Sequence, residues 1–220
     1  MKKAKSFLLL LLLVNVLTAQ EQKFPFWDDI QSFKKEDSLH KPPLHAILFM
    51  GSSSFTNWKD VQGYFPSYKI INRGFGGSTL LDQTRYVNDI VLPYQPKQIV
   101  IYCGENDLAA SDKVTGEIVY TRFVNLFNLI RKKLPGVPVA FISLKPSPSR
   151  WQLRQKMITA NNKIKAYLAT KRKTVFVDVY HKMLDRNGKP MREIFLDDSL
   201  HMNAKGYGIW KKQIEPYLIK

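Results

Sequence analysis

The sequence has little cysteine, few acidic residues and no long uninterrupted apolar segment. Its 220 residues include a single cysteine, Cys103, which excludes an intramolecular disulfide framework and a cysteine-rich zinc site. The chain has 18 Asp and Glu residues and 34 Lys and Arg residues, which gives a formal net charge of +16. The chain contains neither an H-E-x-x-H metal motif nor a P-loop. With 45% hydrophobic and 24% charged residues, the composition is still that of a globular protein.

A nearly unbroken apolar run covers residues 7–17, interrupted at Asn15. Lysines precede it, and the small residues Thr18 and Ala19 follow it. This pattern is typical of a secretory signal peptide, and the run is shorter than the roughly 20 residues that a membrane-spanning helix needs. We predict that residues 1–19 are a cleaved signal peptide, that residues 20–220 form one domain, and that the protein is secreted or periplasmic.

The excess positive charge is scattered along the chain, with small clusters at residues 171–173 and 211–212. Neither cluster is interleaved with aromatic residues, and the sequence carries no nucleic-acid-binding signature. We therefore predict no nucleic-acid partner. The plain interpretation is a solvated basic surface, and the alternative is a weak attraction to anionic envelope polymers or lipid headgroups.

Short apolar, β-rich runs alternate with longer amphipathic patterns after a polar lead-in segment, residues 20–43. The runs are continuous, which favours strands buried on both faces, and the longer patterns repeat every 3.6 residues. This alternation predicts right-handed parallel crossovers and a three-layer α/β/α domain. The predicted strands are 46–50, 68–71, 98–103, 137–143 and 174–179; the predicted helices are 117–134, 151–170 and 203–219, with a helical turn at 55–59.

Polar and glycine-rich clusters follow the predicted strands, at the edge where such sheets bind ligands. These clusters cover residues 51–54, 72–77, 104–107 and 145–149, and residues 198–201 lie just before the last helix. We expect the loop at 146–151 to border a pocket. Trp58 and Trp151 are candidates for stacking on a sugar, although core packing is the commoner role for tryptophan. Cys103, which ends a buried run, is interpreted as a core thiol.

Ser53 follows the first predicted strand directly. Serines at 52–54 can act as helix N-caps, but the same position suits a nucleophile, because a helix N-terminus favours developing negative charge. A serine nucleophile needs a neighbouring base to take its proton.

Four histidines are available as the base. His40 and His45 precede the first strand, at the wrong end of the sheet, whereas His181 follows the fifth strand and could approach the site. His201 lies three residues after Asp198, a spacing that lets the carboxylate fold back onto the imidazole. An isolated Asp-x-x-His is a weak signal that structural turns also produce.

Two further clusters offer hydrogen-bond donors for an oxyanion. A peptide N–H in the turn with Gly74, Gly76 and Gly77 is one candidate, and the side-chain amide of Asn106 is another. Each cluster could equally be a turn, since glycine and asparagine are turn formers.

Together these four blocks resemble the SGNH/GDSL hydrolase family. The resemblance spans nearly the whole predicted mature chain. Residues 47–53 match the first block, with Ser53 at the nucleophile position and Ser52 where the family usually has aspartate. Residues 72–77 match the glycine block, with Gly77 at the oxyanion position. The Gly-x-Asn-Asp block is intact at 104–107, and the Asp-x-x-His block at 198–201 is followed by Gly206-Tyr207, which also resembles the family.

The resemblance implies a flavodoxin-like parallel sheet of five strands and ester hydrolysis without a metal or other cofactor. It implies a catalytic triad of Ser53, His201 and Asp198. It also implies an oxyanion hole formed by the N–H groups of Ser53 and Gly77 and the amide of Asn106. The sequence is most similar to the platelet-activating-factor acetylhydrolase-like and carbohydrate acetylesterase-like branches.

We therefore expect a serine esterase acting on a small-molecule or carbohydrate ester with a short acyl group, such as acetyl. The alternatives are a lysophospholipase or thioesterase of the same fold, and a non-catalytic secreted protein that binds glycans or the envelope. An imidazole accepts a proton only when neutral, so the activity of such an enzyme should rise with pH through about 6.5.

Overall fold

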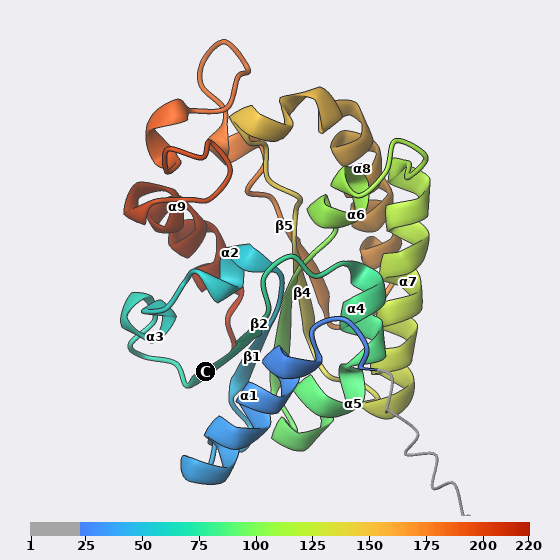
Figure 1. The fold of residues 1–220 in the computed structure, drawn as a ribbon, viewed down its shortest axis with the longest axis vertical. Coiled ribbons are helices and arrows are strands. Elements are labelled where there is room, and N and C mark those ends of the chain that lie inside the picture. Colours follow the sequence, from blue (N-terminus) through green and yellow to red (C-terminus); the bar gives the residue numbers. More distant parts are fainter. Residues whose placement is uncertain (1–22) are drawn as a thin grey trace, which may run out of the picture.

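The computed structural model describes residues 23–220, and the predicted signal peptide lies outside this range. Five parallel strands form one sheet in the order β2-β1-β3-β4-β5, with helices on both faces (Figure 1). This order is that of the flavodoxin-like folds, and the predicted α/β architecture is confirmed. The strands are β1 (Ile47–Gly51), β2 (Ile70–Gly74), β3 (Gln98–Tyr102), β4 (Val139–Ile142) and β5 (Thr174–Val177).

Helices of very different length connect the strands. The longest, α7 and α8, lie side by side on one face of the sheet, and α9 lies on the other (Figure 1). No helix within residues 23–220 is long and apolar enough to cross a membrane. The α-helices are α1 (Trp27–Leu39), α2 (Ser53–Thr56), α3 (Val61–Tyr64), α4 (Leu80–Arg85), α5 (Val87–Ile90), α6 (Glu105–Ala109), α7 (Gly116–Lys133), α8 (Arg154–Ala169) and α9 (Ala204–Ile214); the 3₁₀ helices are η1 (Leu92–Tyr94), η2 (Pro148–Leu153), η3 (His181–Met183), η4 (Arg192–Ile194) and η5 (Glu215–Tyr217).

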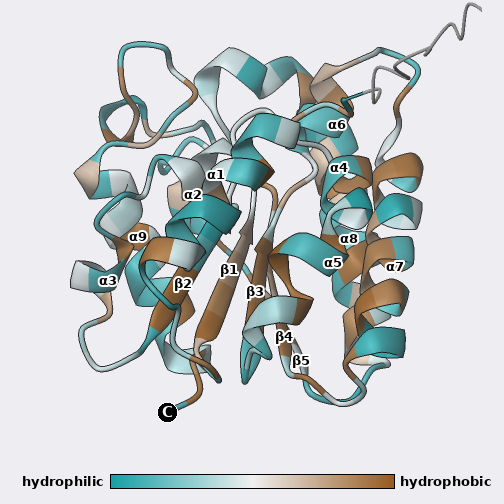
Figure 2. Cartoon of the chain, turned by 60° about the horizontal axis from the view of Figure 1, so that its bottom comes forward, coloured by the Kyte–Doolittle hydropathy of each residue, from teal (hydrophilic) through white to brown (hydrophobic). Residues whose placement is uncertain are grey.

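The strands are hydrophobic because both faces of the sheet are covered. Every residue of β1, β3 and β4 is buried, and β1 is hydrophobic over most of its length in Figure 2. Leu48 and Met50 of β1 face one core cluster, which includes side chains of α7 and α8. Ile47 and Phe49 face a second cluster, which includes Trp210 of α9. This two-sided burial is why the strands read as continuous apolar runs rather than alternating ones.

The register of the sheet aligns the carboxyl ends of three strands. Gly51 at the end of β1 is paired with Gly74 on one side and with Tyr102 on the other. The loops that follow β1, β2 and β3 therefore begin together at one edge of the sheet, where the sequence predicted the polar clusters to meet.

The polar lead-in segment contains a helix that the sequence analysis did not predict. Helix α1 covers Trp27–Leu39, and its Ile30 is completely buried in the core. Phe33 packs against the same core cluster. The apolar residues are few and far apart in a charged segment, so the helical period is weak.

Several predicted boundaries were also wrong. The turn expected at 55–59 is helix α2, which begins at Ser53 and ends at Thr56, and strand β2 runs over 70–74 instead of 68–71. The short helices α4 and α5, between β2 and β3, were not predicted. The last predicted helix ends early, at Ile214, and Pro216 lies in the 3₁₀ turn that follows. The first residues of the predicted helix 151–170 belong to η2.

Side chains cap the outer edge of β2. Gln62 Oε1 accepts a hydrogen bond from the N–H of Ile70 at 3.1 Å, and Asn72 Oδ1 accepts one from the N–H of Gly74 at 3.0 Å. Arg73 Nη1 donates to the carbonyl oxygen of Asn72 at 2.9 Å. These bonds occupy backbone groups that an edge strand would otherwise offer to another chain.

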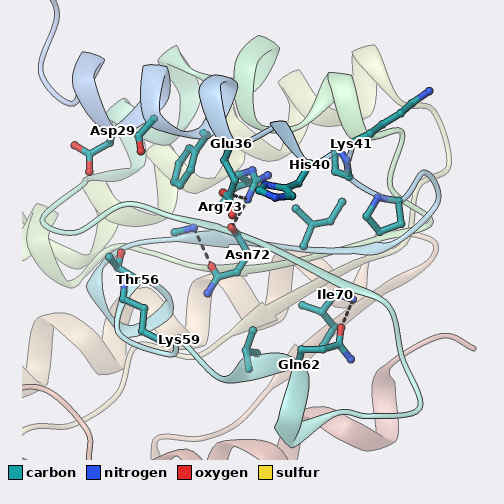
Figure 3. Close-up of a pocket in the computed structure, with 17 residues that line it drawn as sticks. Asp29, Glu36, His40, Lys41, Thr56, Lys59, Gln62, Ile70, Asn72 and Arg73 are labelled. Atoms are coloured by element: carbon teal, nitrogen blue, oxygen red, sulfur yellow. Dashed lines mark hydrogen bonds and ion pairs between the residues drawn. The ribbon is translucent and has the colours of Figure 1, made fainter. Parts of the chain in front are cut away.

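Helix α1 is joined to this edge through Arg73. The buried guanidinium forms an ion pair with Asp37 of α1, and its Nε donates to the hydroxyl of Tyr94 at 2.6 Å. Between α1 and β2 lies a cavity of about 620 Å³, lined by side chains that include Glu36, Asn72 and Arg73 (Figure 3). Ser53 and His201 are not among its lining residues.

Candidate active site

Ser53 stands at a sharp turn between β1 and α2. Gly51 makes this turn possible, because a Cβ there would lie 1.9 Å from the carbonyl oxygen of Tyr102 and the backbone φ is +156°. The N–H of Ser52 donates to that same carbonyl oxygen at 3.1 Å. Ser53 is then the first residue of α2, and its N–H donates no hydrogen bond to any described residue. The turn thus presents both the hydroxyl and the N–H of Ser53.

His201 lies beside Ser53 although 148 positions separate them in the chain. Its Nε2 is 3.0 Å from Ser53 Oγ, and its Nδ1 is 2.6 Å from Asp198 Oδ2. A ring that donates from Nδ1 to the carboxylate has a free lone pair at Nε2 to accept the serine proton. The structure therefore brings the three predicted triad residues together in the order that nucleophilic catalysis requires.

The turn that carries Asp198 and His201 is fixed by backbone hydrogen bonds. Asp198 Oδ1 accepts from the N–H groups of Leu200 and His201, each at 2.9 Å. The N–H of Leu196 donates to the carbonyl oxygen of His201 at 2.8 Å, which closes the loop. The carboxylate is therefore held against the imidazole before any substrate arrives.

These contacts lower the pKa of Asp198. Partial desolvation favours its protonated form, but the hydrogen bonds from the backbone N–H groups of Leu200 and His201 and from the His201 ring outweigh this effect. Together they lower the pKa of Asp198 to about 2. The carboxylate is thus ionised over the whole pH range in which an imidazole can act as a base.

Two further donors face the same space. Gly77 has a φ of +81°, which favours glycine, and its N–H donates no hydrogen bond to any residue that the structure describes. Asn106 Nδ2 donates to the carbonyl oxygen of Ser78 at 3.0 Å, which leaves the second amide hydrogen free. One cavity of about 320 Å³ is lined by Ser53, Asn57, Gly77, Asn106, Arg150, Leu200 and His201.

Asp107, next to Asn106, has a structural role that the sequence analysis missed. It is completely buried, and it accepts hydrogen bonds from the N–H of Leu80 at 3.0 Å and from Arg122 Nη1 at 2.8 Å. Burial raises the pKa of Asp107 above its ordinary value, although both hydrogen bonds oppose this effect. The residue joins α6 to α4 and α7, which explains why a second acid follows the asparagine of the motif.

A buried ion pair lies beneath the same helix. Lys145 Nζ is 2.8 Å from Glu105 Oε2, and the side chains are 2% and 4% exposed. The hydroxyl of Tyr102 donates to the same carboxylate oxygen. Tyr102 and Glu105 are neighbours in the chain, but Lys145 lies 40 residues further on, so sequence spacing gave no sign of this network.

The remaining candidates lie elsewhere. His181 is paired with Asp178, at 2.6 Å, and lines a different cavity. Trp58 is completely buried and stacks on Tyr207, so it cannot contact a sugar. Trp151 is half-buried and contacts the cationic groups of Arg154 and Lys189, each 5.4 Å from its ring centroid.

Tyr207 and Cys103 are core residues next to segments that form the site. The Tyr207 hydroxyl donates to the carbonyl oxygen of Ser54 at 2.9 Å, tying α9 to α2. Cys103 is a fully buried thiol, as expected, and burial raises its pKa well above the ordinary value.

Across residues 23–220, no three His, Cys, Asp or Glu side chains gather in a position to hold a metal ion.

Comparison with known proteins shows the family of the chain. The profile of the GDSL-like lipase/acylhydrolase family matches residues 44–209. The chain belongs to this family. It is thus a hydrolase of the esterase type, and the resemblance seen in the sequence is confirmed. None of the curated proteins compared with the chain matches it significantly.

Solved structures share the fold of this GDSL-like hydrolase. A GDSL-like lipase from Bacteroides thetaiotaomicron is 23% identical, with a TM-score of 0.71 over 85% of this chain and 95% of its own. A candidate acylhydrolase from Bacteroides fragilis is 25% identical, with a TM-score of 0.73 over 86% and 95%. A family 3 carbohydrate esterase from Talaromyces cellulolyticus is 16% identical, with a TM-score of 0.63 over 77% and 94%.

Proposed function

We propose that this GDSL-like hydrolase is a serine esterase that cleaves esters of short acyl groups, acetyl above all. The observation that carries the proposal is the chain of contacts from Ser53 Oγ to His201 Nε2, 3.0 Å, and from His201 Nδ1 to Asp198, 2.6 Å. A serine hydroxyl that merely capped a helix would not need a histidine oriented by a carboxylate.

In the first half of the reaction, Ser53 Oγ attacks the ester carbonyl carbon and its proton passes to His201 Nε2. The carbonyl oxygen becomes an oxyanion, which accepts hydrogen bonds from the N–H groups of Ser53 and Gly77 and from Asn106 Nδ2. Asp198 stabilises the imidazolium that forms. The tetrahedral intermediate collapses when the carbon–oxygen bond to the alcohol breaks and His201 returns the proton to the departing alkoxide.

In the second half, water replaces the alcohol. His201 takes a proton from the water as its oxygen attacks the acyl carbon, and the same donors hold the second oxyanion. The bond between the acyl carbon and Ser53 Oγ then breaks, and the proton on His201 restores the hydroxyl. The products are a carboxylic acid and the free enzyme.

The polar lining of the cavity supports a short acyl group. Its volume is about 320 Å³, and among the described residues that line it Leu200 alone is apolar. A long acyl chain needs an apolar surface to replace water, at about 0.8 kcal/mol for each buried CH₂ group. Acetyl needs little of this apolar surface, and the family 3 carbohydrate esterase of the same fold supports a carbohydrate ester as the substrate.

The test is a series of 4-nitrophenyl esters with acetyl, butyryl and octanoyl groups, assayed with the wild-type protein and with Ser53→Ala. We expect the acetyl ester to give the highest kcat/KM and Ser53→Ala to abolish turnover and labelling by a serine-directed phosphonate. Ser52→Ala, which removes the neighbouring hydroxyl, is the control for folding and should retain activity.

Each alternative has its own outcome. A clear preference for octanoyl would favour a lysophospholipase or thioesterase. A folded protein that binds glycans but neither hydrolyses these esters nor reacts with the phosphonate would be a binding protein. Full activity of Ser53→Ala would place the nucleophile elsewhere.

We further propose that the protein is exported, on the basis of the signal-peptide pattern in residues 1–19. Expression in a bacterial host followed by N-terminal sequencing of the exported protein tests this. Chain that stays in the cytoplasm with residues 1–19 attached would contradict it.

A further inference from the structure

Arg150 is a charged residue in the wall of the active-site cavity. It belongs to η2, is half-buried, and lines the cavity together with Ser53, Asn106 and His201. Its Nη2 donates a hydrogen bond to Asn106 Oδ1 at 2.9 Å. The reaction scheme above assigns it no role.

The position of Arg150 is fixed by the loops around it. Its own N–H donates to the carbonyl oxygen of Ser147 at 3.2 Å. The preceding N–H, of Ser149, donates to the carbonyl oxygen of Ser199 at 3.1 Å, which joins this loop to the turn that carries His201. These bonds fix the backbone of Arg150 next to the turn that carries His201, and the bond to Asn106 holds the guanidinium at the cavity.

Most of the hydrogen-bonding capacity of this guanidinium is unused. An arginine side chain has five N–H donors, and the bond to Asn106 accounts for one. Within residues 23–220, no carboxylate oxygen lies within 4.0 Å of Arg150. The acids of the neighbouring motifs are occupied: Glu105 pairs with Lys145, Asp107 with Arg122 and Asp198 with His201.

Two neighbouring cations do not line the cavity. Arg154 and Lys189 both contact the ring of Trp151, the residue that follows Arg150. Arg150 is thus the one arginine or lysine among the described residues that line the cavity. A guanidinium without a paired acid attracts an anion, and its planar fork fits the two oxygens of a carboxylate.

We propose that Arg150 determines specificity by binding a carboxylate on the alcohol part of the substrate, close to the ester that Ser53 attacks. The inference rests on the proposed esterase function and narrows its substrate to short acyl esters of hydroxy acids, acidic sugars among them. Arg150 is also a positioning residue, because its bond to Oδ1 turns the amide so that Nδ2 of Asn106 faces the oxyanion.

The test compares two esters that differ in one charge, 3-acetoxybenzoate and its methyl ester. The readout is the ratio of their kcat/KM values, measured in wild type, Arg150→Lys and Arg150→Gln. We expect Arg150→Gln to lower the ratio of anionic to neutral ester about 10- to 100-fold, mainly through KM, with Arg150→Lys in between. The kcat for both esters should also fall, because Asn106 loses its partner.

Arg154→Gln is the matched control. It removes the same charge from the same segment, but Arg154 does not line the cavity. The ratio should stay within about threefold of wild type. An equal fall of the ratio in Arg154→Gln and Arg150→Gln would mean that general positive charge, and not Arg150, selects the substrate.

A binding measurement separates this inference from the proposed reaction. Titration calorimetry of 3-hydroxybenzoate and of its methyl ester with Ser53→Ala, with and without Arg150→Gln, reports anion recognition without turnover. Weaker binding of the acid alone in the Arg150→Gln protein supports the inference even if neither ester is hydrolysed. If the ratio and the binding of the acid are both unchanged by Arg150→Gln, the inference is wrong while the esterase function stands.

Discussion

Asn106 has both polar atoms of its side chain engaged, since Oδ1 accepts from Arg150 and Nδ2 donates to Ser78. The remaining amide hydrogen is the one that the proposed reaction would use. Asn106→Ala should therefore lower kcat on the order of 10²- to 10³-fold with little change in KM. Steady-state kinetics with phenyl acetate measure this, with circular dichroism to verify the fold. An unchanged kcat would show that the oxyanion is held by backbone groups alone.

Asp198 orients His201, so its amide replacement should disturb the tautomer of the ring. In Asp198→Asn, an amide N–H can face Nδ1 and move the ring proton to Nε2, where it blocks acceptance from Ser53. We expect kcat to fall by about 10³- to 10⁴-fold at neutral pH. Stopped-flow and steady-state assays check this. Activity within tenfold of wild type would show that the backbone contacts of the turn suffice to hold the ring.

The pKa of Asp198 also predicts a pH dependence of stability. Its pKa is about 2 in the folded protein, below the ordinary value of 3.8, so the ionised form stabilises the fold. This contribution is complete above about pH 4 and is lost as the pH falls through about 2. The difference in Tm between wild type and Asp198→Asn should therefore shrink between pH 5 and pH 2.5. A constant difference would contradict the assignment.

At the scale of residues, the sequence predicted the three side chains that the structure brings together and missed the residues that hold the neighbouring motifs in place. Ser53, Asp198 and His201 stand in short blocks whose spacing carries chemical meaning. The partners of Asp107 and Asn106 do not stand in such blocks. Arg122 and Arg150 lie in other segments of the chain, and only the fold brings them to Asp107 and Asn106. A lone arginine in a polar loop gives no sign of the side chain it will meet.

At the scale of elements, the Lys145–Glu105 pair fixes α6 under the loop after β4. Lys145→Met would leave the buried Glu105 carboxylate without its cation, which should lower the free energy of unfolding by about 3–5 kcal/mol. The double variant with Glu105→Gln should recover part of this loss. Urea unfolding measures all three proteins.

The control for this prediction is an exposed pair. Lys163 and Glu117 are 3.9 Å apart with side chains about half exposed, so Lys163→Met should change stability by less than about 1 kcal/mol. Equal effects at Lys145 and Lys163 would mean that the buried pair contributes no more than a surface one.

Helix α1 shows where prediction of elements fails. Its 13 residues carry acids and lysines, and a single residue, Ile30, is fully buried. Its attachment depends on Arg73 and Tyr94, which bind Asp37 from other parts of the chain. Amphipathic period alone could find α7, whose apolar face is wide. It could not find a charged helix with a single fully buried residue, held by an ion pair at a sheet edge.

At the scale of the whole molecule, the sequence predicted the fold correctly, because the alternation of strands and helices along the chain strongly constrains the topology of the sheet. Continuous apolar runs separated by helical patterns allow few arrangements other than a parallel sheet with right-handed crossovers. In the observed order, β1 lies between β2 and β3, so the loops after these three strands share one edge. The site could therefore be located before its distances were known.

The charge of the whole molecule carries the last prediction. The formal charge of the full chain is +16, scattered over the sequence, so an anionic ester should be attracted from beyond the cavity. Raising the salt from about 0.02 M to 0.5 M shortens the Debye length several-fold, which should lower kcat/KM for 3-acetoxybenzoate several-fold and leave the methyl ester unchanged. Arg150→Gln should keep this salt dependence, because it removes one charge among many. If the dependence disappears in Arg150→Gln, the attraction is local to Arg150, and the scattered lysines and arginines contribute nothing to substrate binding.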